Sequence, residues 1–237
     1  MKKSNEPKAA VRTSPRKQVP AKPLTKKPSR RKPKPQAQRS ADTRNRLIDA
    51  AIACLARVGY SATTVTLVAE EAEVSRGAMT HQYPAKNDLM LAVVEAVYER
   101  DGEHYRRTVA EKSPMRWIQD LPATMWDVIS QPSGIAVIEI MLASRSDREL
   151  ADKLRSVQRN IDMTAHQWIV ERLESAGLRD RPDGEAVHRL FVAAIRGLSL
   201  EGLFRRDRAG VEKSVAVLSE ILGILYPATA VRSSSQS

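Results

Sequence analysis

The chain of 237 residues has 42% apolar side chains, which is enough to bury one large or two small hydrophobic cores. Its formal net charge of +11 is concentrated in the first 40 residues, which hold 14 Lys and Arg and a single acid, so the remainder is close to neutral. One cysteine excludes a disulfide within the chain, and no run of roughly eighteen apolar residues is present to span a bilayer. We therefore expect a cytoplasmic protein with no membrane partner.

Residues 1–40 contain seven prolines and almost no large apolar side chains. Such a segment cannot offset the entropy that it would lose on folding, so we expect a disordered basic arm. Two roles remain open for it. The arm could follow the minor groove or the phosphate backbone of DNA, which its positive charge favours, or it could be a solvated tail without a function.

A helical pattern begins at Ala41 and continues to Tyr226 without any strand-like alternation, which predicts an all-α protein. The first helix is expected over 42–57, and Gly59 is expected to end it in a left-handed conformation. Its apolar face consists of Leu47, Ile48, Ala51, Ile52 and Leu55.

Two short helices are expected next. Thr64 is a suitable N-cap for one of them, and Ser75 for the other, which covers Arg76–Gln82. A longer helix then starts at Ala85 or Asn87. Two short helices joined by a tight turn are typical of a helix-turn-helix unit, in which the second helix lies in the DNA major groove. The alternative is an ordinary three-helix start to a larger bundle.

The small residues at the start of the second short helix let it approach a duplex, and its polar side chains can donate hydrogen bonds to bases or phosphates. For Tyr83, packing in the core is as good an interpretation as a phosphate contact. The expected DNA-binding residues are Thr64, Ser75, Arg76, Gly77, Thr80, His81, Tyr83 and Lys86.

The chain closely resembles the TetR family of bacterial repressors over the contiguous segments TRNRLIDAAIACLARVGYSATTV and LVAEEAEVSRGAMTHQYPAKNDLMLAV. The resemblance implies a nucleoid-associated regulator that releases its DNA operator when a small-molecule inducer binds. It also implies four parts: a basic arm (1–40), a helix-turn-helix domain (41–90), a helical ligand-binding and dimerisation domain (91–227) and a flexible C-terminus (228–237).

Four residues depart from the family pattern. Thr80 stands where a phosphate-contacting Tyr is usual, and Gln82 replaces a common His. Glu73 replaces a Gly suited to a left-handed turn, at a cost of about 1 kcal/mol if that geometry is kept. Ala85 replaces an N-cap Ser, a further loss of about 1 kcal/mol unless Asn87 takes over.

Large, adaptable side chains are frequent between residues 114 and 175. At helical spacing each of them can be a core residue, but together they suit an apolar pocket between helices, and the resemblance places such a pocket at about 90–175. Its effector should be largely hydrophobic. The candidate pocket residues are Met115, Trp117, Met125, Trp126, Met141, Met163 and Trp168.

Two charged residues interrupt apolar helices, Glu139 in GIAVIEIMLA and Arg196 in LFVAAIRGLSLEGLF. Because a lone buried charge is costly, we expect them to pair with each other or with a polar group of a ligand. The apolar helices expected at about 148–175 and 184–206 are candidates for a homodimer interface.

Two other classes of function are less well supported. The four histidines are scattered, and the sequence shows no spacing typical of a metal site and no phosphate-binding glycine loop, so we expect no enzyme activity, metal or cofactor. A non-specific DNA-compacting protein would account for the basic arm but not for the long neutral helical body.

Overall fold

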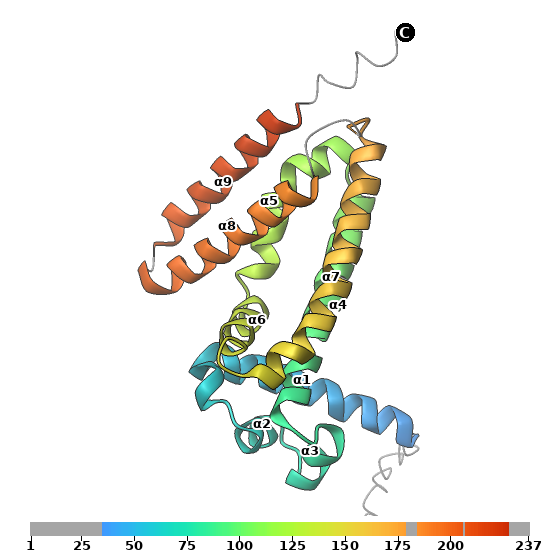
Figure 1. Cartoon of the computed structure of the whole chain (residues 1–237), viewed down its shortest axis with the longest axis vertical. Helices are drawn as coiled ribbons and strands as arrows, with labels where there is room; N and C mark the ends of the chain where they lie inside the picture. Colours follow the sequence, from blue (N-terminus) through green and yellow to red (C-terminus); the bar gives the residue numbers. More distant parts are fainter. Residues whose placement is uncertain (1–34, 179–183, 206, 228–237) are drawn as a thin grey trace, which may run out of the picture. The chain divides into compact units, whose positions relative to one another are not determined.

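The computed structural model describes residues 35–178, 184–205 and 207–227, and within these ranges it contains nine helices and no strand (Figure 1). The all-α prediction is therefore confirmed for the described part. Residues 1–34 and 228–237 lie outside it, so the disorder expected there stays a prediction. Residues 36–40 were expected to belong to the disordered arm, but they are helical. None of the described helices is long and apolar enough to cross a membrane.

The N-terminal part begins with a helix that is longer than expected, because it starts before residue 41. Ser40 accepts a hydrogen bond from Nε2 of Gln82 at 2.8 Å, which ties the first turns of this helix to the end of the third. Gly59 has the expected positive φ, 77°, and marks a kink before the last turn. The three helices of this part are α1 (Gln36–Ala62), α2 (Val65–Glu71) and α3 (Arg76–Gln82).

Several of the remaining helices begin at residues that suit a helix start. Ser113 and Asp147 are side-chain caps, and Pro132 occupies the first turn of its helix. The first of these helices passes without a break through the domain boundary expected at 90/91. The helices are α4 (Lys86–Ala110), α5 (Pro114–Ile129), α6 (Pro132–Ala143), α7 (Arg148–Ser175), α8 (Gly184–Arg205) and α9 (Arg208–Leu225).

Two clusters of buried side chains hold the described helices together. One joins α1–α4 to Ala136, Val137 and Ile140 of α6 and to the first half of α7. The other joins α5 and the second half of α7 to α8 and α9, around Trp117 and Phe191. Because α6 belongs to the first cluster, it packs directly against the helices of the N-terminal part.

Candidate DNA-binding surface and internal cavity

The helix-turn-helix unit starts its two helices with hydroxyl caps, as expected. Thr64 Oγ1 accepts the backbone N–H of Leu67 at 3.1 Å, and Ser75 Oγ accepts that of Ala78 at 3.2 Å. Each cap satisfies an N–H group that the first helical turn leaves without a partner. Both cap residues remain exposed, so the N-termini of α2 and α3 reach the surface.

The turn between α2 and α3 keeps the left-handed geometry that a glycine would favour. Glu73 has a φ of 52°. Arg46 on α1 braces this turn, because its Nη2 donates to the carbonyl oxygens of Ala72 and Glu73. Our sequence analysis missed Arg46, and no local pattern reveals it, since the contacts join residues that are 26 and 27 positions apart.

Helix α3 has a buried side and an exposed side. Met79 is buried and anchors the helix, while Arg76, Gly77, Thr80 and His81 are exposed. A Cβ added to Gly77 would meet no other atom within 4 Å, so this part of the helix faces open space. The exposed side can therefore enter a groove of DNA without any rearrangement of its own packing.

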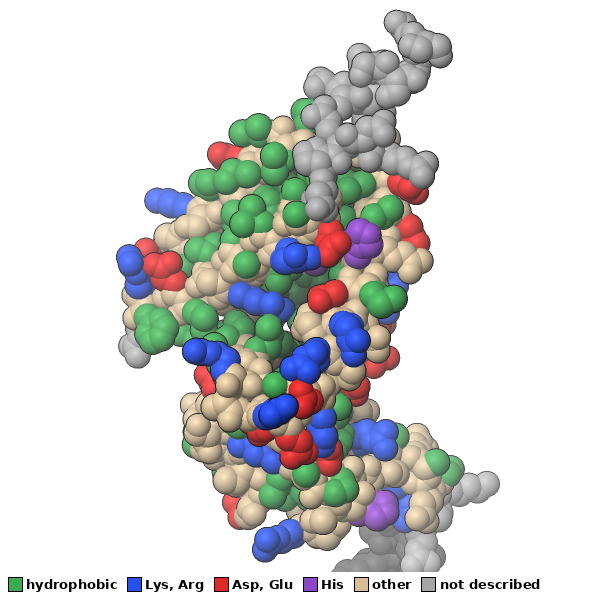
Figure 2. Space-filling model, viewed as in Figure 1, with side chains coloured by type: hydrophobic (Ala, Val, Ile, Leu, Met, Phe, Trp, Pro, Cys, Tyr) green, Lys and Arg blue, Asp and Glu red, His purple; other side chains and the backbone are tan. Residues whose placement is uncertain are grey.

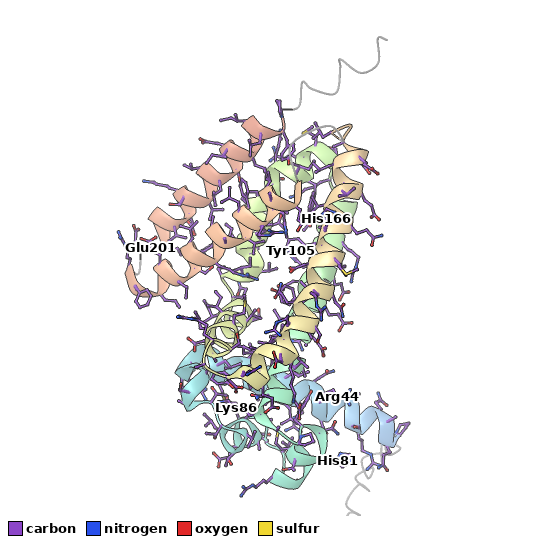
Figure 3. All side chains as sticks on the ribbon, viewed as in Figure 1. Arg44, His81, Lys86, Tyr105, His166 and Glu201 are labelled. Atoms are coloured by element: carbon purple, nitrogen blue, oxygen red, sulfur yellow. The ribbon has the colours of Figure 1, made fainter. Side chains whose placement is uncertain are left out.

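An arginine on α1 extends this surface. Arg44 is exposed and lies at the same end of the described part as His81 (Figure 3). It was not among the residues expected to bind DNA, although a basic side chain at the start of the first amphipathic helix was a usable signal. Arg44 can supply a phosphate contact beside α3.

Tyr83 is a correction to the expected DNA-binding set. Its side chain is only 6% exposed and belongs to the cluster around α1–α4. Its hydroxyl has no hydrogen-bond partner among the described residues, and burial raises the pKa of this phenol. Tyr83 is therefore a core residue, because the chain turns its ring inward as α3 ends.

Lys86 is a second correction. Its Nζ donates to the carbonyl oxygen of Tyr60 at 2.7 Å and lies 3.8 Å from the centroid of the Tyr60 ring. Burial of the ammonium group lowers the pKa of Lys86. The side chain therefore joins the start of α4 to the end of α1 instead of reaching outward to a phosphate.

Polar side chains fasten the first turn of α4 to α7. Asp88 accepts the backbone N–H of Ala85 at 3.2 Å, which is the bond that the third helical residue makes in a capping box, so the missing N-cap hydroxyl itself is not replaced. Asp88 also pairs with Lys153 at 2.6 Å, and Asn87 donates to the α7 cap residue Asp147 at 3.3 Å. A displacement of α7 would therefore act directly on the helix that follows α3.

A cavity of about 790 Å³ lies among α4, α5, α6, α7 and α8. Four of the seven expected pocket residues line it: Trp117, Met125, Met141 and Trp168. The other three do not. Met115 and Trp126 pack on the cluster around α5, α8 and α9, and Met163 is 71% exposed on the outer side of α7.

The cavity wall is more polar than the sequence suggested. Tyr98, Asp101 and Tyr105 contribute from α4, and His188 and Arg196 from α8. Burial raises the pKa of Asp101 to about 6, and burial together with the charge of Arg196 lowers that of His188 to about 4. Except for Arg196, these residues were missed because nothing in a single helical segment shows which face will border a cavity.

The expected pair of Glu139 and Arg196 does not form. Glu139 on α6 accepts the backbone N–H of Tyr60 at 2.9 Å. Arg196 Nη2 donates to the hydroxyl of Tyr98 at 2.7 Å. The pairing was wrong because α6 places Glu139 against the end of α1, whereas Arg196 faces the cavity.

Comparison with known proteins identifies the family. Residues 47–93 match the model of the bacterial regulatory proteins of the tetR family. The helix-turn-helix transcriptional regulator CymR of Pseudomonas putida is 31% identical over 180 residues, which are 75% of this chain and 88% of CymR. The chain belongs to the TetR family. It is thus a DNA-binding transcription regulator, a class of protein without enzyme activity.

Solved structures of TetR-like regulators share the fold. A regulator of this family from a Rhodococcus species superimposes with a TM-score of 0.63 at 17% identity, over 78% of this chain and 98% of that one. The regulator FadR of Bacillus subtilis, solved in complex with stearoyl-CoA, has a TM-score of 0.57 at 16% identity over the same shares of the two chains. TetR-family regulators bind operator DNA as dimers and bind small molecules.

Proposed function

We propose that this TetR-family chain is a repressor that binds a palindromic operator as a homodimer and leaves it when a small molecule enters the cavity. The observation that carries the proposal is the outer face of α3, where Arg76, Gly77, Thr80 and His81 are exposed while the buried Met79 anchors the helix. Two such helices about 34–36 Å apart would read successive major grooves.

The homodimer in this proposal keeps the expected segment 184–206, which is α8, and uses α9 in place of the expected segment 148–175, which is α7. Hydrophobic side chains gather over α8 and α9 in Figure 2. Phe204 and Ile224 are 84% and 77% exposed, which is costly unless a second copy covers them. The exposed large apolar residues of α8 and α9 are Leu190, Leu203, Phe204, Val217, Ile221 and Ile224.

Release from DNA would start at the cavity. Helix α6 contributes Val137 and Met141 to the cavity wall and also packs, through Ala136 and Ile140, in the cluster around α1–α4. The bond between Glu139 and the Tyr60 N–H adds a polar link at the same place. A ligand that shifts α6, α7 or α4 would thus change the position of the helix-turn-helix unit in each subunit, and hence the distance between the two α3 helices.

The deciding experiment is DNase footprinting of the purified chain on the DNA upstream of its own coding region. We expect protection of a near-palindrome with two half-sites. This protection should persist when excess random DNA is added at moderate salt. Equal competition by random DNA would favour the alternative of a DNA-compacting protein. A screen of small molecules on the footprinted fragment then tests release.

A further inference from the structure

Arg196 is a half-buried cation in the cavity wall without an acidic partner. Of the other arginines there, Arg189 pairs with Glu185 and Arg106 is exposed at the edge. In the part of the chain that the structure describes, no carboxylate oxygen lies within the 4.0 Å of an ion pair from Arg196. A guanidinium group removed from water gains most from a negative charge brought to it.

The contact between Arg196 and Tyr98 leaves hydrogen-bond donors facing the cavity. The Tyr98 hydroxyl oxygen accepts from Arg196 Nη2 at 2.7 Å, so its own O–H is available to donate elsewhere. Arg196 has further N–H groups and no acceptor atom. The two side chains together form a site that offers only donors, which suits an oxyanion.

Among the described residues, the titratable groups near Arg196 form no ion pair with it. His188, two turns earlier on α8, has a pKa lowered to about 4 and is neutral near pH 7. Burial raises the pKa of Asp101 on α4 to about 6, so Asp101 is mostly ionised at pH 7, but its carboxylate lies beyond ion-pair distance of Arg196. Asp162 on α7 is exposed and accepts a hydrogen bond from Gln158.

Aromatic rings border the same cavity. The ring centroids of Trp117 and Trp168 are 4.8 Å apart, and those of Trp168 and Tyr105 are 5.9 Å apart. Tyr105 follows Tyr98 by seven residues, so both lie on the same face of α4. The aromatic wall and the donor site therefore belong to one binding space.

We propose that the effector is an organic anion whose carboxylate or sulfonate group binds Arg196 and Tyr98 while its apolar body lies against Trp117 and Trp168. This inference rests on the proposed function in one respect, that the cavity is the effector site. It narrows the effector from a largely hydrophobic molecule to one with a negative end.

Two fluorescent probes of nearly the same shape test the inference. 8-Anilinonaphthalene-1-sulfonate carries a sulfonate, and N-phenyl-1-naphthylamine is its uncharged counterpart. We expect the full-length protein to bind the sulfonate more tightly, by about tenfold or more, because charge-assisted hydrogen bonds are worth that factor.

The variant Arg196→Met should remove this preference and leave binding of the neutral probe within about twofold of the wild type. Tyr98→Phe should lose a smaller part of it. Arg189→Met is the matched control, since Arg189 already pairs with Glu185. Circular dichroism checks that each variant is folded. Equal affinity of the wild type for both probes, or an equal loss of both in Arg196→Met, would overturn the inference.

The same variants separate this inference from the proposed function. If 8-anilinonaphthalene-1-sulfonate releases the wild type and Arg196→Met from the footprinted DNA at the same concentration, the repressor function stands and the anion site falls. If tight binding of the sulfonate probe requires Arg196 but neither probe releases the protein from DNA, the anion site stands and the release mechanism falls.

Discussion

Glu139 on α6 accepts the backbone N–H of Tyr60 at 2.9 Å, and this bond joins a helix of the cavity wall to the end of α1. Removing the carboxylate in Glu139→Ala would leave a half-buried N–H group without its acceptor. We expect the free energy of unfolding to fall by about 1–2 kcal/mol, measured by urea denaturation. Glu139→Gln retains an acceptor oxygen and should lose less. Wild-type stability in Glu139→Ala would contradict the role of this bond.

Gly77 should be important for DNA binding and not for the stability of the fold. A methyl group there meets no protein atom within 4 Å, so Gly77→Ala should be stabilised by about 0.5–1 kcal/mol through its lower helix entropy cost. The same methyl group would lie where α3 meets the duplex, so we expect weaker operator binding in fluorescence anisotropy. Undiminished affinity would mean that this side of α3 does not approach DNA closely.

Lys86 and Arg44 should affect the salt dependence of DNA binding differently. Lys86 is held by Tyr60, so Lys86→Met should lower stability by about 1 kcal/mol and leave the slope of log K against log salt unchanged. Arg44 is exposed beside α3, so Arg44→Ala should reduce that slope by about one. A reduced slope in Lys86→Met would indicate that this lysine does contact a phosphate.

The proposed dimer interface can be tested with one charge placed on either of two surfaces. Phe204→Asp puts a carboxylate on the exposed apolar face of α8 and α9, and we expect monomers in sedimentation velocity and loss of operator affinity. Met163→Asp alters an apolar residue on α7 that is also largely exposed, and this variant should remain dimeric. The opposite pattern would return the interface to α7.

The basic arm should act through its charge. Deleting residues 1–34 removes most of the arm and leaves α1 complete. We expect this deletion to weaken binding to all DNA sequences alike and to reduce the dependence of DNA affinity on salt. An arm of the same length with its Lys and Arg changed to Gln serves as the control for length, and it should behave as the deletion does. If the deletion variant has the same salt slope as the wild type, the arm does not contribute to DNA binding.

Local sequence patterns predicted the helix-turn-helix unit well because its signals act over a few residues. Thr64 and Ser75 cap their helices and Gly59 has a positive φ, each as expected. The turn at Glu73 also keeps its left-handed geometry. Caps, turns and helical periodicity depend on neighbours in the chain, so a single sequence contains that information.

The side chains that join distant segments depended on the tertiary structure. Lys86 and Tyr83 carry groups that suit DNA, yet packing turns one onto Tyr60 and the other into the core. Glu139 and Arg196 looked like a pair and found separate partners, because α6 faces α1 and α8 faces the cavity. The sequence by itself determined the helices and the exposed face of α3. Only the packing of helices far apart in the chain decided which polar groups are enclosed, since burial and partner choice are set by contacts that no local pattern encodes.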